Sequence, residues 1–151
     1  MERDGGTSAG AAGDTPPLAI ALDNDLFFAV KVADTLRHAG YQTRTVRRVD
    51  DFVASLASGP VVAVVNTAAR GVDWHAAIAA ARDAGIPVIA FGPHVDLAAQ
   101  EEARRAGATA VISNSKLAND LPGVVARTLH RKGLDAAKTQ RDDAGMASGT
   151  S

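Results

Sequence analysis

The chain has 151 residues, of which 46% are hydrophobic and 4% aromatic, so it can form one compact domain with a substantial core but not two. Its formal net charge is −1, which leaves no overall field to draw it to nucleic acid or to an anionic membrane. Cysteine is absent, and this excludes a disulfide scaffold, a thiolate metal site and a cysteine nucleophile.

The two ends of the chain differ in composition from its middle. Residues 1–17 are rich in glycine and contain two adjacent prolines, and residues 133–151 are small, polar and aperiodic. We expect flexible tails at 1–17 and 133–151 around a single domain at 18–132. No apolar run approaches the roughly 18 residues of a membrane span, and the first residues lack the features of a signal peptide. A soluble, cytoplasmic protein is therefore expected.

Short apolar runs predict the strands, and runs with helical spacing predict the helices between them. The predicted strands are Leu18–Leu22, Tyr41–Val46, Val61–Asn66, Pro87–Phe91 and Ala108–Ile112. The predicted helices run over Leu26–Ala39, from Asp50 or Asp51 to Gly59, from Asp73 to Ala84, from Asp96 to Gly107 and from Leu117 to about Arg131. The faces expected to point inward carry Phe27, Val30, Ala33 (or Val32) and Leu36 in the first helix, and Phe52, Val53 and Leu56 in the second.

Four glycines organise these elements into repeats. Gly40, Gly59, Gly85 and Gly107 each follow a helical pattern and precede a strand, so the chain consists of five βα units of roughly 22 residues each. Right-handed crossovers then require a parallel sheet with helices on both faces. We predict an α/β domain with three layers, α/β/α, and five parallel strands in the order 2-1-3-4-5, an order taken by analogy with known five-unit folds.

The third strand is the centre of the prediction. Its five apolar residues are followed by Asn66, and such a run indicates a strand buried on both faces. Open α/β sheets place their functional groups at the carboxyl ends of their strands. Asn66 is therefore the first candidate for a functional residue.

With these elements, the chain from about Leu18 to Arg131 resembles a receiver domain of the response-regulator (CheY-like) family. The family usually has Asp-x-x-x-Pro-x-x-Asp-Gly after its third strand. Here Asn66 stands at the phosphoacceptor position, Arg70 replaces the proline, Asp73 matches and Trp74 replaces the glycine. The resemblance implies a flavodoxin-like fold and a role in two-component (phosphorelay) signal transduction.

The departures from the family fall on its phosphorylation site. The resemblance implies a pair of acids after the first strand, a phosphoacceptor, a hydroxyl residue after the fourth strand and a lysine after the fifth. The corresponding residues here are Asp23, Asn24, Asn66, Gly92 and Asn114. Only the first of these keeps the expected side chain. We regard these five as the positions of a degenerate phosphorylation site.

The changes have direct chemical consequences. A neutral amide at Asn66 is a poor nucleophile and cannot form an acyl phosphate, so no phosphorylation is expected. Mg²⁺ needs anionic oxygens, and only Asp23 remains, unless Asp25 swings in to restore weak binding. We predict no catalytic residues, no metal, no cofactor and one fixed conformation that phosphate does not switch.

A small polar pocket at the same edge is the main alternative site. Asp25, Asp73 and His94 are candidate ligand contacts there, beside Asp23 and Asn66. The competing interpretation, which we favour, is that the aspartates and asparagines cap helices and bond neighbouring loops. No two histidines have the spacing of zinc ligands, and no glycine-rich loop or nucleophile elbow indicates a nucleotide site or a hydrolase.

We therefore expect an atypical, stand-alone pseudo-receiver that is not an enzyme and acts as a phosphorylation-independent protein-interaction module. Its expected partners are proteins, such as a signalling kinase or an effector, or a second copy in a homodimer. The resemblance implies helix 96–106 with strand 108–112 as one candidate interface, although the sequence does not show which face is left uncovered, and Trp74 would add an anchor if exposed. The basic section at 127–141 has no aromatic residues and favours a solvated helix end over a nucleic-acid site. The alternative function is a small-ligand sensor that uses the pocket.

Overall fold

A five-stranded parallel sheet forms the centre of the structure, a computed structural model that describes residues 15–149. The strands lie in the spatial order β3-β2-β4-β5-β6, and all four neighbouring pairs are parallel. This confirms the predicted order 2-1-3-4-5 and the flavodoxin-like fold. The strands are β2 Leu18–Leu22, β3 Gln42–Val46, β4 Val62–Asn66, β5 Val88–Gly92 and β6 Ala110–Ser113.

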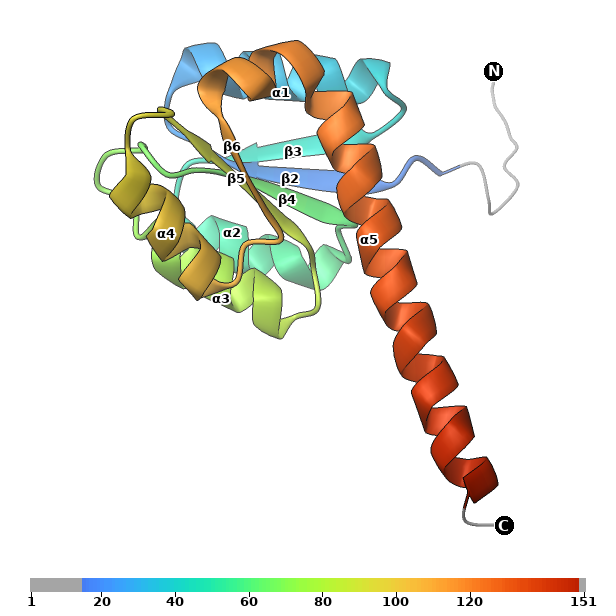
Figure 1. The fold of residues 1–151 in the computed structure, drawn as a ribbon. Coiled ribbons are helices and arrows are strands. Elements are labelled where there is room, and N and C mark those ends of the chain that lie inside the picture. The colour runs from blue at the N-terminus through green and yellow to red at the C-terminus, as the bar shows by residue number, and fades with distance from the viewer. Residues whose placement is uncertain (1–14, 150–151) are drawn as a thin grey trace, which may run out of the picture.

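Helices cover both faces of the sheet (Figure 1). Helices α1 and α5 pack on one face, and α2, α3 and α4 pack on the other. They are α1 Leu26–His38, α2 Val49–Ser55 followed by the 3-10 turn η3 Leu56–Ser58, α3 Trp74–Asp83, α4 Leu97–Ala106 and α5 Asn114–Gly149. Asp25, Asp73 and Asp96 each accept a backbone N–H in the first turn of α1, α3 and α4. These three caps confirm the helix starts predicted from the sequence.

Strand β4 is buried on both faces, as its apolar run predicts. Val62 and Val64 pack in the core under α1 and α5, while Val65 packs under α2 and α3. None of the three has exposed surface, and burying each valine contributes about 1.5–3 kcal/mol to stability. The strand ends at Asn66, which pairs in register with Phe91 of β5. Asn66 is thus held in place by the core beneath it.

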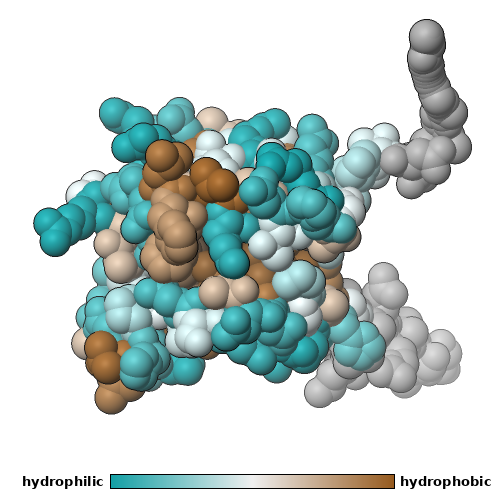
Figure 2. All heavy atoms as spheres, turned by 90° about the horizontal axis from the view of Figure 1, so that it is seen from above, coloured by the Kyte–Doolittle hydropathy of each residue, from teal (hydrophilic) through white to brown (hydrophobic). Residues whose placement is uncertain are grey.

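The inward face of α1 differs from the prediction. The helix buries Val32 and Leu36, but Phe27 and Val30 are 72% and 51% exposed. Apolar residues lie on two sides of this helix, so periodicity alone fits either orientation. With Leu26, which is 75% exposed, these two residues form an exposed apolar group that we call the α1 cluster. Figure 2 looks onto this side of the molecule and shows apolar atoms gathered on it.

Helix α2 also begins differently from the prediction. It starts at Val49, and its N-cap residue Arg48 makes no capping hydrogen bond through its side chain. Asp50 and Asp51, the predicted caps, lie instead in the first turn, where their charge favours the helix dipole. Val53, predicted to point inward, is 44% exposed.

Helix α5 is longer than predicted at both ends. It starts at Asn114, bends at Asp120 (φ −150°, ψ 35°), and continues past Pro122 to Gly149. Pro122 follows the bend directly, in the first turn of the second segment, where a missing N–H costs little. The prediction of a helix end near Arg131 is wrong, because residues 133–149 are helical, whereas the flexible tail at 133–151 stays a prediction. Residues 134–141 consist mostly of good helix formers, and this outweighs their lack of apolar periodicity.

The predicted N-terminal tail falls largely outside the described residues, because only 15–17 of it are described. Within residues 15–149, no helix is both long enough and apolar enough to cross a membrane.

A substitution at Gly133 can test whether α5 continues through this residue. A Cβ added at Gly133 meets no atom within 4 Å, so Gly133→Ala should add helical signal in circular dichroism and raise the free energy of unfolding by up to about 1 kcal/mol. Gly107→Ala is the opposite control, because Gly107 has φ +115° and its Cβ would lie 2.5 Å from Arg82 Cδ. If Gly133→Ala leaves both quantities unchanged, the helix ends before this residue.

Candidate functional site

The side chain of Asn66 is the centre of the carboxyl edge of the sheet. It is 3% exposed. Its Nδ2 donates to Asp23 Oδ1 at 2.9 Å, and its Oδ1 accepts from Ala68 N at 2.8 Å. These partners fix which end of the amide is oxygen, because Ala68 N–H needs an acceptor and the Asp23 carboxylate needs a donor. Both ends of the amide are thus occupied by the protein itself.

Asp23 lies under this edge and is 1% exposed. Its Oδ1 also accepts from Asp25 N at 2.8 Å, whereas its Oδ2 is buried without a partner. Burial raises the pKa of Asp23, and the hydrogen bonds from Asp25 and Asn66 oppose the rise only in part. The folded protein therefore holds the Asp23 proton more tightly than the unfolded chain. Its contribution to the free energy of unfolding falls as pH rises from the usual aspartate range through the raised pKa.

Asn24 and Asp25 connect the start of α1 to its surroundings. Asn24 Nδ2 donates to the backbone carbonyl of Arg70 at 2.8 Å, and so ties β2 to the loop after β4. Asp25 Oδ1 accepts from Phe27 N at 3.0 Å as the cap of α1. The structure thus gives each polar side chain of this turn a local hydrogen-bonding partner, as the competing interpretation expects.

Thr67 occupies the place where a side chain on Gly92 would lie. Its Oγ1 donates to the Phe91 carbonyl at 3.2 Å, and a Cβ built on Gly92 would be 2.4 Å from that Oγ1. The end of β5 therefore has a hydroxyl beside it, supplied by the neighbouring loop. Sequence reasoning did not single out Thr67, although its position directly after Asn66 and the glycine at the end of the next strand were both visible.

An open cavity of about 390 Å³ lies above Asn66. It brings together four of the predicted residues with two arginines and two apolar residues. Its lining is Asn24, Asp25, Phe28, Arg47, Asn66, Ala68, Arg70 and Asn114. Arg47 comes from the loop after β3 and Arg70 from the loop after β4. Neither arginine was predicted as a site residue.

The other predicted contacts lie elsewhere. Asp73 lines a neighbouring hollow of about 370 Å³ together with Arg47, Arg48 and Asp50, and its Oδ1 accepts from Ala76 N at 3.1 Å. His94 is exposed and lines neither hollow. The roles of Asp25, Asp73 and His94 in ligand binding stay predictions.

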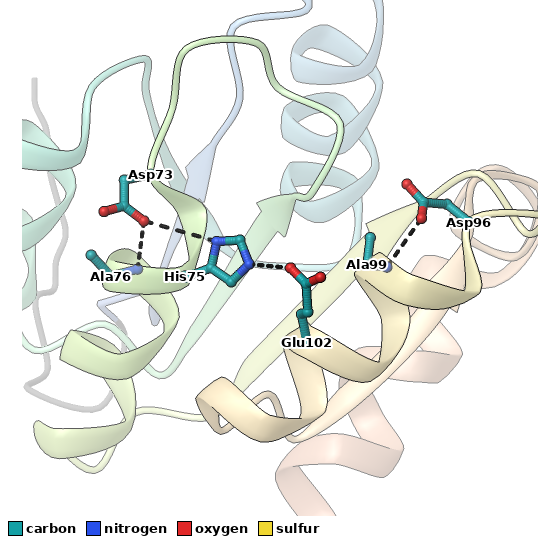
Figure 3. Close-up of polar contacts among 6 residues, drawn as sticks. All are labelled: Asp73, His75, Ala76, Asp96, Ala99 and Glu102. Carbon is teal, nitrogen blue, oxygen red and sulfur yellow. Dashed lines mark hydrogen bonds and ion pairs between the residues drawn. The ribbon is translucent and has the colours of Figure 1, made fainter.

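A polar link joins α3 to α4 beyond this edge (Figure 3). His75 Nε2 lies 2.6 Å from Glu102 Oε1, and His75 Nδ1 lies 3.9 Å from Asp73 Oδ1. The His75 ring stacks on Trp74 with centroids 3.6 Å apart, and Trp74 is 7% exposed, so it is a core residue and not an interface anchor. Because His75 and Glu102 are each about half exposed, this pair is worth at most about 1 kcal/mol.

The described part of the chain contains no group of three or more histidine, aspartate or glutamate side chains that could hold a metal ion. At the carboxyl edge of the sheet, Asn24 and Asn66 stand where the resemblance implies carboxylates, and Asp23 has one oxygen engaged in two hydrogen bonds.

Comparisons with known proteins identify the fold. No protein-family model matches the sequence, and a search of curated proteins finds no significant match. A solved structure described as a response regulator from Chloroflexus aurantiacus aligns with a TM-score of 0.70 at 19% identity, over 77% of this chain and 99% of that chain. The receiver domain of NtrX from Brucella abortus aligns at 0.67 and 22% identity, over 74% and 98%. A longer NtrX structure aligns at 0.74 and 21% identity, over 83% of this chain but 29% of that one. The structural neighbours are therefore response-regulator receiver domains, and the chain has their fold.

The hydrogen bond between Asn66 and Asp23 can be tested with Asn66→Asp. The introduced carboxylate removes the donor and adds a like charge, so the free energy of unfolding at pH 7 should fall by about 1–3 kcal/mol. The loss should shrink toward pH 5, because one protonated carboxyl of the pair can donate to the other. Urea unfolding at both pH values measures this. Asn119→Asp, at an exposed position, is the matched control, and an equal effect of the two substitutions would contradict the assigned bond.

The contact between Thr67 and Gly92 predicts an energetic coupling. Gly92→Ala should cost about 1–3 kcal/mol of stability, because the new Cβ overlaps Thr67 Oγ1. In a Thr67→Ala background the same substitution should cost much less. A double-mutant cycle from chemical unfolding measures the difference, and additive effects would show that the two residues do not compete for space.

Proposed function

We propose that this chain is an atypical receiver that acts in signal transduction as a protein-interaction module independent of phosphorylation. The observation that supports this most is the state of Asn66. Its amide is neutral, buried and bonded at both ends. A side chain of this kind offers no free nucleophilic oxygen to a phosphoryl donor.

The surroundings of Asn66 support the same conclusion. A divalent ion at this edge would need several anionic oxygens, and the cavity contributes a single carboxylate, that of Asp25. Thr67 fills the space at Gly92, and Asn114 stands at the position of the family's lysine. The groups that would sense a phosphoryl group and transmit its presence are thus replaced or displaced.

The α1 cluster is the surface that best fits the proposed interaction. Leu26, Phe27 and Val30 are each more than half exposed on one helix, and exposed apolar groups of this kind are typical of interaction sites. The candidate interface at α4 is less suitable, because that helix exposes mainly charged residues after Leu97. The proposed partner is a protein: a signalling kinase, an effector or a second copy of this chain.

Phosphorylation can be tested directly. The purified chain is incubated with acetyl phosphate and Mg²⁺, and its mass is measured under denaturing conditions. We expect no added phosphoryl group, because the amide of Asn66 cannot form an acyl phosphate. A conventional receiver with its aspartate, treated in parallel, shows that the reagent is active. A phosphoryl group on the wild-type chain that Asn66→Gln removes would overturn the proposal.

A further inference from the structure

The cavity above Asn66 is lined by two positively charged side chains that have no ion-pair partner in it. Arg47 and Arg70 reach it from two different loops. Among residues 15–133, whose side chains the structure describes, neither guanidinium forms an ion pair or a side-chain hydrogen bond, whereas the adjacent Arg48 lies 4.0 Å from Asp50. Two arginines that line one hollow and have no ion-pair partner there supply the groups by which proteins hold oxyanions.

Asn114 adds an unsatisfied polar group to the same cavity. Its Oδ1 is buried and has no hydrogen-bond partner. The residue itself is only half-buried and lines the cavity. Because its Oδ1 is inaccessible, Nδ2 with its two donors is the end of the amide that a ligand oxygen can meet.

The acidic groups near the cavity are largely occupied. Asp25 is the only carboxylate in its lining, and its Oδ1 accepts two backbone N–H groups at the start of α1. Asp23 lies below, with its Oδ1 bonded by Asn66 and Asp25, and burial further disfavours its charge. Within the lining of this cavity, two guanidinium groups therefore accompany one exposed carboxylate, while Asp50 and Asp73 share the neighbouring hollow with Arg47.

We propose that this cavity binds a phosphate dianion, as inorganic phosphate or as a small phosphate monoester, without a covalent bond and without a metal ion. Arg47 and Arg70 hold the phosphate from two sides, and Asn114 donates to one of its oxygens. Phe28 forms an apolar wall of the cavity against which the ester group of a monoester packs. This inference is independent of the proposed interaction function, because it concerns only reversible binding.

A ligand that packs against Phe28 would contact a residue adjacent to the α1 cluster. The Phe28 ring lies 5.3 Å from that of Phe27 and 5.6 Å from that of Phe91, measured between centroids. A ligand packed on Phe28 therefore touches the residue that supports the exposed Phe27. The cavity and the proposed interaction surface are separated by one aromatic side chain.

Calorimetric titration of the full chain, in buffer with chelator and no divalent ion, tests the proposal. The probes are inorganic phosphate and phenyl phosphate. We expect saturable binding of at least one probe, weakened about 10- to 100-fold by Arg47→Gln or Arg70→Gln, and not strengthened by Mg²⁺. Arg48→Gln is the matched control and should leave the affinity unchanged. Thermal unfolding shows whether each variant is folded, and the backbone carbonyl of Arg70 that bonds Asn24 is retained in the variant.

The outcomes separate the sources of the ligand. Equal affinity for both probes indicates inorganic phosphate, and tighter binding of phenyl phosphate that Phe28→Ala abolishes indicates a monoester. Absence of saturable binding by either probe at millimolar concentration overturns the proposal, as does equal weakening by Arg48→Gln, which would indicate only a general charge effect. A reversibly bound phosphate dissociates under denaturing conditions and adds no mass in the acetyl phosphate experiment. The phosphate-binding proposal and the proposed phosphorylation-independent function can therefore be refuted independently of each other.

Discussion

The hydrogen bond between Asn66 and Asp23 joins the two central strands at the edge where the functional groups of this fold gather. It satisfies the buried amide, orients the Asp23 carboxylate toward the Asp25 N–H, and leaves one carboxylate oxygen without a partner. The two side chains coexist in a buried place because only one of them is an acid. With a second acid, the pair would need a cation or a proton to offset the repulsion. The neutral amide of Asn66 therefore allows the pair to stay buried without a cation.

Most of the fold was predictable because the helix starts, the helix ends and the apolar runs of the sequence all indicate the same structure. Glycine followed four of the five helices, aspartates began three of them, and the apolar run before Asn66 marked the central strand, so element order and layer arrangement followed. The orientation of α1 was not predictable in this way. Leu36 and the alternative Val32 are buried as predicted, whereas Phe27 and Val30, which have the right spacing and large side chains, are exposed. Periodicity defines a helix and its apolar stripes, while the choice between stripes depends on contacts with other elements.

The functional site was predictable at the strand ends and not in the loops. Asn66 was found because it ends a predicted strand, and Asn24 and Asn114 were found because the family resemblance assigns functional positions just after strand ends. Arg47 and Arg70 lie in loops whose paths depend on the whole fold, so no local pattern indicates that they face one cavity. A polar cluster was expected at this edge, but its positive charge could be recognised only once those two loops were placed in space.

The packing of Thr67 against Gly92 bears on how this chain can change in evolution. A side chain at position 92 meets the volume that the threonine fills, and a carboxylate at the end of β4 meets repulsion from its buried neighbour. Each substitution is unfavourable alone and is better tolerated once its neighbour has changed as well. The side chains at this edge can therefore be replaced together more easily than one at a time.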